Sequence, residues 1–98
     1  MVKCLKCGQE IAKPVASISG GIMGDEYSDV YYLCPKCELY TVESVHDRFC
    51  GEETAQTCGP LAKTEGDQKI AVIKRCETPW DKKCRCPAHL DYFGPVLD

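Results

Sequence analysis

Cysteine is the residue type with the clearest chemical potential in this sequence, with 9 copies in 98 residues. Four of them form two Cys-x2-Cys pairs, Cys4–Cys7 and Cys34–Cys37. Each pair presents two thiols from one tight turn, and the segment between the pairs is long enough to fold back as a hairpin. Four thiolates that converge in this way bind one tetrahedral metal ion, most often zinc. We therefore predict that the first half of the chain folds around a metal site at these cysteines.

The residues around the two pairs suit tight turns joined by strands. Gly8 follows the second thiol of the first pair and permits a positive φ, so that backbone N–H groups can point at sulfur. Pro35 fixes φ inside the second pair. Apolar and β-branched residues separated by glycine-rich turns predict strands over three stretches of the first half, residues 11–18, 29–33 and 40–45.

Two Cys-x2-Cys turns, here called knuckles, are separated by a hairpin and a strand. This arrangement resembles the zinc-ribbon superfamily over roughly residues 1–45. The resemblance rests on Cys4, Cys7, Gly8, Cys34, Pro35 and Cys37. It implies that the four cysteines are zinc ligands and that residues 1–47 form a zinc-ribbon-like module. The sequence departs from the pattern at Glu38, where the second knuckle lacks the glycine of the first, and in a longer glycine-rich middle.

Two redox interpretations compete with structural zinc at the paired cysteines. A rubredoxin-like iron site uses the same two knuckles, but the aromatic residues expected just after Gly8 are absent. A thioredoxin-type motif at Cys34–Cys37 should open a helix after a strand, whereas the residues that follow it are strand-like. Structural zinc is the better prediction of the three.

The second half carries a further group of potential ligands, which we treat as a second metal-binding region over residues 48–98. One choice is a Cys3His site made of Cys76, Cys84, Cys86 and His89. Cys50 and Cys58 are alternative ligands, because the interval from Cys50 to Cys58 equals that from Cys76 to Cys84. Those four could form a Cys4 site or hold an iron–sulfur cluster. Each choice leaves thiols over, and the sequence alone does not decide between them.

The second half is predicted to contain one strand and short helices. Residues 52–69 are polar and predict mostly loop with one short helix, and the apolar run at 69–74 predicts a strand. Thr78 and Pro79 have the order of an N-cap followed by a first helical residue. Pro87 can begin a short helix that brings His89 beside Cys86. The expected fold is a small, metal-stabilised α+β unit in which both halves pack together.

Composition limits the kinds of partner and compartment. The net charge of -3 disfavours nucleic acid as the dedicated partner, since such binders usually have a basic excess. Neither a long apolar run nor an apolar signal segment after Met1 is present, so we expect no membrane span. Unpaired cysteines at metal-ligand spacing indicate a reducing cytoplasm.

These features predict a non-catalytic zinc protein that serves a larger complex as an interaction or accessory subunit. A zinc ion closed by four thiolates has no open position for Lewis-acid chemistry. Basic residues around the second group and acidic residues on the first hairpin offer two charged faces to a protein partner: Lys82, Lys83 and Arg85, and Asp25, Glu26 and Asp29. The alternative is an iron–sulfur or rubredoxin-like redox subunit of an anaerobic enzyme. His46, flanked by Asp47 and Arg48, is expected to be a surface or hydrogen-bonding histidine.

Overall fold

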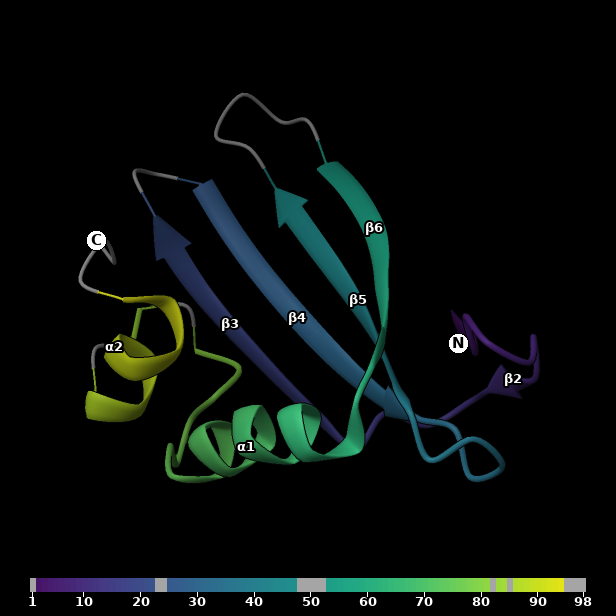
Figure 1. The fold of residues 1–98 in the computed structure, drawn as a ribbon. Helices are drawn as coiled ribbons and strands as arrows, with labels where there is room; N and C mark the ends of the chain where they lie inside the picture. The colour runs from purple at the N-terminus through teal and green to yellow at the C-terminus, as the bar shows by residue number, and fades with distance from the viewer. Residues whose placement is uncertain (1, 23–24, 48–52, 82, 85, 95–98) are drawn as a thin grey trace.

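The computed structural model describes residues 2–22, 25–47, 53–81, 83–84 and 86–94, and it shows a small α+β protein (Figure 1). β1 and β2 pair as a small antiparallel hairpin, and the next four strands form an antiparallel sheet in chain order. The elements are β1 (Val2–Lys3), β2 (Glu10–Ile11), β3 (Ala16–Ile22), β4 (Asp25–Leu33), β5 (Tyr40–Asp47), β6 (Glu53–Leu61), α1 (Lys63–Lys74) and α2 (Pro87–Phe93).

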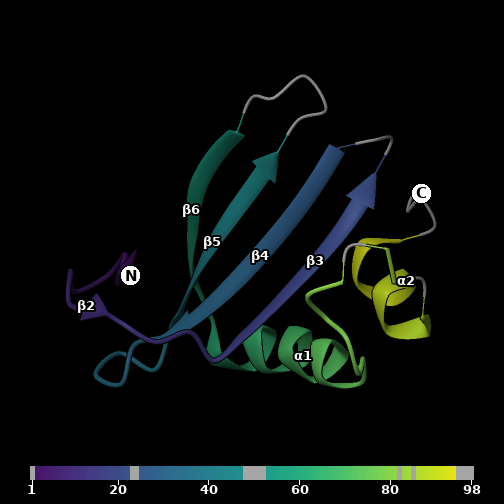
Figure 2. The same cartoon turned by 180° about the vertical axis from the view of Figure 1, so that it is seen from behind.

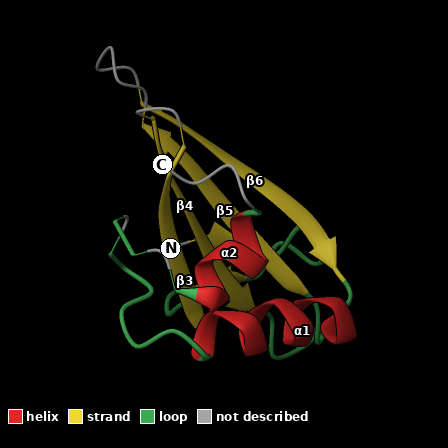
Figure 3. Cartoon of the chain, turned by 90° about the vertical axis from the view of Figure 1, so that its left-hand side faces the viewer, coloured by secondary structure: helices red, strands yellow, loops and turns green. Residues whose placement is uncertain are grey.

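Both helices lie on the same face of the four-stranded sheet (Figure 3). α1 crosses one end of that face, while α2 lies beside the edge strand β3 (Figures 1 and 2). In the register of the sheet, Ala16 on β3 is opposite Tyr31 on β4, and Tyr31 is opposite Val42 on β5. Because side chains alternate along a strand, these residues share one face and form a row toward the helices.

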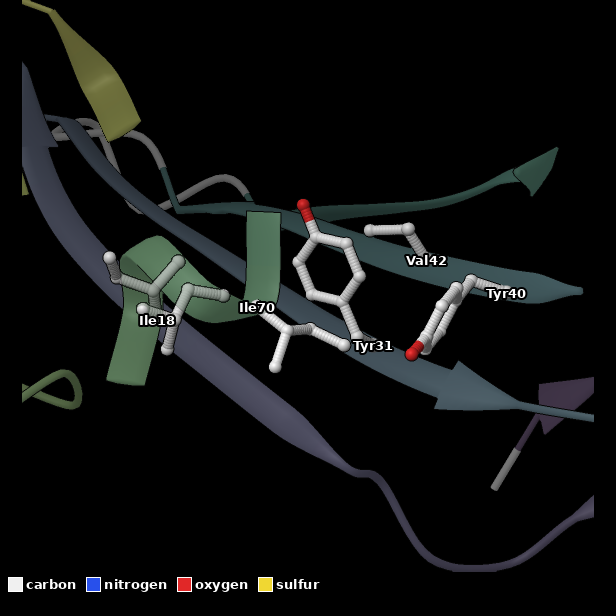
Figure 4. Close-up of a cluster of buried hydrophobic side chains, with 6 residues drawn as sticks. Ile18, Tyr31, Tyr40, Val42 and Ile70 are labelled. Carbon is white, nitrogen blue, oxygen red and sulfur yellow. The ribbon is translucent and has the colours of Figure 1, made fainter. Parts of the chain in front are cut away.

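The main hydrophobic core lies between this face and α1. It consists of Ile18, Tyr31, Tyr40 and Val42 from the sheet and Ile70 and Ile73 from the helix. Figure 4 shows Ile18, Ile70 and Tyr31 close together, with Val42 and Tyr40 further along β5. Tyr92 and Phe93 extend the same cluster from α2. The second half of the chain therefore supplies the helical cover for strands made by the first.

Side chains on the opposite face of β4 contribute to a second, smaller core. Tyr32 points away from Tyr31 and packs with Val2, Ile11 and two of the predicted ligands, Cys4 and Cys34. The β1–β2 hairpin is thereby attached to the far end of the sheet from α2 (Figure 1). Adjacent tyrosines on one strand hold the two cores together.

The predicted strand at residues 69–74 is wrong, because this stretch is the second half of α1. Gly66, Ile70 and Ile73 are the buried residues of the helix. They recur at the spacing of one helical face. The loop predicted for most of residues 52–69 is also wrong, since β6 occupies Glu53–Leu61, while the short helix expected in this stretch corresponds to the beginning of α1. β6 pairs with β5 over most of its length as an edge strand, the position in a sheet that tolerates Pro60.

Of the two predicted helix starts, only the one at Pro87 is confirmed. The predicted helix start at Thr78 is wrong: the chain makes a turn there, in which the N–H of Asp81 donates to the carbonyl of Thr78 at 3.0 Å. Pro87 does begin α2, where its missing N–H costs no hydrogen bond. The predicted strands at 29–33 and 40–45 lie within β4 and β5, whereas residues 11–18 are divided between β2 and β3. Neither α1 nor α2, the helices of the described part, has the length and apolarity to cross a membrane.

Candidate metal centres

The first predicted pair of cysteines lies in a knuckle that closes the β1–β2 hairpin. The N–H of Cys4 donates to the carbonyl of Gln9 at 2.8 Å, and the N–H of Gly8 donates to the carbonyl of Cys4 at 2.9 Å. Gly8 has a φ of 78°, which a side chain would disfavour. The turn bends the chain so that the N–H of Lys6 faces the Cys4 sulfur, 3.4 Å away.

The second pair repeats this knuckle between β4 and β5. The N–H of Cys34 donates to the carbonyl of Leu39 at 3.0 Å, and the N–H of Glu38 donates to the carbonyl of Cys34 at 2.9 Å. Glu38 takes the place of the glycine with a φ of 54°. The departure from the zinc-ribbon pattern at this residue therefore changes the side chain and leaves the knuckle intact.

The two knuckles bring all four predicted thiols of the first site together. The sulfur atoms of Cys4, Cys7, Cys34 and Cys37 lie within 4.8 Å of one another. The sulfurs of Cys7 and Cys34, from different knuckles, are 3.6 Å apart. Cys4 and Cys34 are buried and Cys7 is exposed, so the group lies at the surface with one side covered by the smaller core.

The surroundings of these thiols shift the pKa values of Cys4 and Cys37 in opposite directions. The backbone N–H groups of Cys7 and Lys6 lower the pKa of Cys4 to about 6, because they stabilise the thiolate. The neighbouring Cys7 thiol, burial and Cys34 together raise the pKa of Cys37 to about 12. Four thiolates this close repel one another, and a bound divalent cation is what allows all of them to ionise together.

The predicted second site is built from the segment that follows α1 and from α2 itself. Cys76 lies just past the end of α1, and its N–H donates to the carbonyl of Ile73 at 3.1 Å. Cys86 is the N-cap residue of α2, and His89 is in the first turn of that helix. The donor atoms of Cys76, Cys84, Cys86 and His89 all lie within 4.8 Å of one another.

Individual distances show how compact the second group is. The sulfurs of Cys76 and Cys84 are 3.7 Å apart. The Nδ1 atom of His89 lies 3.2 Å from the sulfur of Cys76 and 3.5 Å from that of Cys86. A cavity of about 320 Å³ opens beside the three sulfurs. Burial raises the pKa of Cys76 to about 11, and the backbone N–H of Cys86 followed by the Thr78 side chain lowers that of Cys84.

His89 is fully buried, and both of its ring nitrogens have partners. Its Nε2 lies 2.9 Å from the carbonyl oxygen of Ser19 on β3, to which it donates a hydrogen bond as Nε2–H. That tautomer leaves the lone pair of Nδ1 facing the two sulfurs, which is the orientation a metal-binding imidazole needs. Ser19 also donates its N–H to the carbonyl of Pro79 at 2.8 Å. No feature of the sequence signals this role of Ser19, which acts through its backbone.

The remaining candidate ligands lie elsewhere. Cys58 is exposed on β6, at the sheet edge opposite to β3, and the structure does not bring it to either group of donors. Cys50 lies outside the described residues. His46 on β5 forms a 2.9 Å hydrogen bond with the Asp25 carboxylate and takes part in neither group. Its side chain is 25% exposed, and the contact with Asp25 agrees with the expectation of a hydrogen-bonding histidine.

The distances within both groups fit one tetrahedral ion. Zinc–sulfur bonds of about 2.3 Å in a tetrahedron place two sulfurs about 3.8 Å apart, compared with 3.6 and 3.7 Å here. A multinuclear iron–sulfur cluster shares its four cysteines among two or more irons, so its four sulfurs are spread more widely than the 4.8 Å within which all four donors of each group lie. Both groups could thus hold a metal ion. No family model, curated protein or solved structure matches this chain.

Proposed function

We propose that this chain is a non-catalytic zinc protein with two structural sites, at Cys4, Cys7, Cys34 and Cys37 and at Cys76, Cys84, Cys86 and His89. The observation that carries the proposal is the convergence of four donors within 4.8 Å in each group. A Cys4 or Cys3His set fills all four positions of a tetrahedral zinc ion, which is the pattern of structural sites. We further propose a reducing cytoplasm as the compartment that keeps these thiols free.

Metal analysis of the chain purified without oxygen tests the identity of the metal. We expect a colourless protein with about two zinc ions per chain. Visible charge-transfer bands together with acid-labile sulfide would contradict the proposal and favour the iron–sulfur alternative. Visible bands with iron but no sulfide would favour a rubredoxin-like site at the two knuckles. Alkylation of each cysteine before and after chelation identifies the thiols that the metal protects.

Chelation tests whether the ions are structural. Binding to a structural zinc site is worth on the order of 10 kcal/mol, and the cores of this chain are small. We therefore expect chelation at neutral pH, or Cys37→Ser, to abolish the native near-UV and far-UV signals. Cys58→Ser is the matched control, since this exposed thiol belongs to neither group. A native signal after chelation would mean that the sites do not organise the fold.

An interaction or accessory role is the second part of the proposal. It is supported by two exposed apolar side chains close in sequence to the second group, Trp80 at 69% and Leu90 at 42% exposure. A partner that docks there should be lost with Trp80→Asp and kept with Leu5→Asp, which changes an exposed leucine of the first knuckle. The test is reconstitution of a stoichiometric complex from purified components. Equal loss with both variants would exclude this surface.

A further inference from the structure

The face of the sheet that carries the main core continues past the helices as a polar surface. α1 covers the row that contains Tyr31 and Val42, while the far ends of β5 and β6 extend beyond both helices (Figure 1). By strand register, two further rows lie on this same face. The first contains Asp29, Ser44 and Gln56, and the second contains Tyr27, His46 and Thr54.

These two rows line a cavity of about 420 Å³. That volume falls in the range of small-molecule sites, about 300–1,000 Å³. Among the residues that the structure describes, its polar lining consists of two hydroxyls, an amide, a phenol, an imidazole and a carboxylate, with neither lysine nor arginine. A cavity with this lining disfavours an anionic ligand and favours a ligand that donates hydrogen bonds or carries positive charge.

Asp29 supplies the negative charge of the cavity. Its carboxylate accepts a hydrogen bond from the Ser44 hydroxyl at 2.8 Å and another from the Tyr92 hydroxyl at 2.6 Å. Tyr31 donates in turn to Tyr92 at 2.5 Å. Within the described part of the chain, no lysine or arginine forms an ion pair with Asp29. A carboxylate has about four acceptor positions, so two hydrogen bonds hold Asp29 in place and leave it able to bind a further donor.

An aromatic wall stands beside this carboxylate. The rings of Tyr27 and His46 are stacked with centroids 4.1 Å apart and an angle of 16° between their planes. His46 is held from behind by its 2.9 Å hydrogen bond with the Asp25 carboxylate. On the other side of Tyr27 in the register is Gly20, which has no side chain to cover the ring.

We propose that this cavity binds a small organic ammonium compound, a primary amine on an aromatic or aliphatic stem. The ammonium group would form a charge-assisted hydrogen bond with Asp29, and the stem would lie against Tyr27. Ser44, Thr54 and Gln56 provide acceptors for the remaining ammonium protons. The site uses neither cysteine group, and its ligand chemistry is separate from the proposed zinc binding.

The test is an NMR titration of the full chain with three probes of similar shape and different charge: benzylamine, benzyl alcohol and benzoate. We expect benzylamine to shift the amide signals of Tyr27, Ser44, His46 and Thr54 with a millimolar dissociation constant. Benzyl alcohol should bind about tenfold more weakly, and benzoate should leave these signals unchanged. No shift with benzylamine, or equal binding of the three probes, would overturn the proposal.

A pair of lysine substitutions on β6 makes the test specific for the cavity. Gln56→Lys puts a competing ammonium group into the cavity, and Thr57→Lys adds the same charge on the opposite face of the strand. Both positions are exposed, so both variants should fold. We expect Gln56→Lys to weaken benzylamine binding at least tenfold and Thr57→Lys to leave it nearly unchanged. If both variants weakened benzylamine binding equally, the cause would be the overall charge of the protein, and the proposed site would be wrong.

Discussion

Gly8 and Glu38 occupy the same backbone position in the two knuckles. Each directly follows the second thiol of its pair, has a positive φ and donates its N–H at 2.9 Å to the carbonyl of the first cysteine. A left-handed conformation costs a residue with a side chain about 1–2 kcal/mol, whereas glycine adopts it freely. The second knuckle is therefore the more strained of the two.

Glu38→Gly should relieve this strain and stabilise the zinc-loaded protein. The gain is reduced by the greater freedom of glycine in the unfolded chain, which leaves about 0.5–1 kcal/mol. Urea unfolding at constant metal concentration measures the change. Glu38→Ala is the control, because it removes the carboxylate and keeps the side chain at a positive φ. Stabilisation by both variants to the same extent would assign the effect to charge and not to the backbone.

His89→Gln should remove the metal of the second site and spare that of the first. Glutamine lacks the imidazole nitrogen that faces the sulfurs of Cys76 and Cys86. We expect the zinc content to fall from two ions to one. His46→Gln, at the histidine outside both groups, should retain two ions. His89→Cys restores a fourth donor and should recover the second ion, and failure of that recovery in a folded variant would contradict the ligand role.

Gly66→Ala should destabilise the protein, although alanine is ordinarily the better helix former. A Cβ atom at Gly66 would lie 2.0 Å from Cδ2 of the Tyr40 ring, which the core holds in place. Tyr40 also donates a hydrogen bond to Asp67 in the same helix. We expect a loss of about 1–3 kcal/mol, measured by thermal unfolding. Thr64→Ala, at an exposed position of α1, should stay close to the parent or gain slightly.

Thr41→Val should stabilise the protein by about 1 kcal/mol. Thr41 is 1% exposed, and its hydroxyl has no hydrogen-bond partner among the residues that the structure describes. Valine has nearly the same shape and removes a buried polar group that gains nothing from folding. The free energy of unfolding reports the change, and the exposed Thr57→Val should alter it by a few tenths at most. A loss of stability in Thr41→Val would show that the hydroxyl has a partner in solution.

The knuckles could be predicted from the sequence because their constraints are local. In each knuckle, two cysteines three positions apart predict a tight turn without reference to the rest of the chain. Gly8 supports the first turn, and the β-prone run at residues 29–33 leads into the second. The same locality accounts for Pro87 at the start of α2. The convergence of Cys4, Cys7, Cys34 and Cys37 then needed only that the second knuckle fold back toward the first.

The helix at 63–74 could not be predicted in this way. Its buried face contains Gly66, which contributes no apolar side chain to the pattern, and only Ile70 and Ile73 mark the helical period. A short apolar run is compatible with a strand or a helix, and here the docking of Tyr40 against Gly66 decides. Tertiary packing thus determines the helical structure of residues 63–74, which the local apolar pattern does not indicate.

The choice among ligands in the second half was likewise a matter of topology. The equal intervals from Cys50 to Cys58 and from Cys76 to Cys84 made both pairs plausible. The order of strands in the sheet puts β6, with Cys58, on one edge and β3 on the other. Because α2 lies beside β3 and His89 contacts Ser19, the second group forms at that edge.

The contacts of Ser19 have a consequence for how copies of this chain meet. β3 is an edge strand, and the unpaired backbone groups of such an edge are a template onto which a foreign strand can be added. At Ser19 both groups are occupied, the N–H by Pro79 and the carbonyl by His89. The segment that would bind the second ion thus also blocks the addition of a foreign strand at this position. We therefore expect loss of the metal to promote aggregation as well as to lower stability.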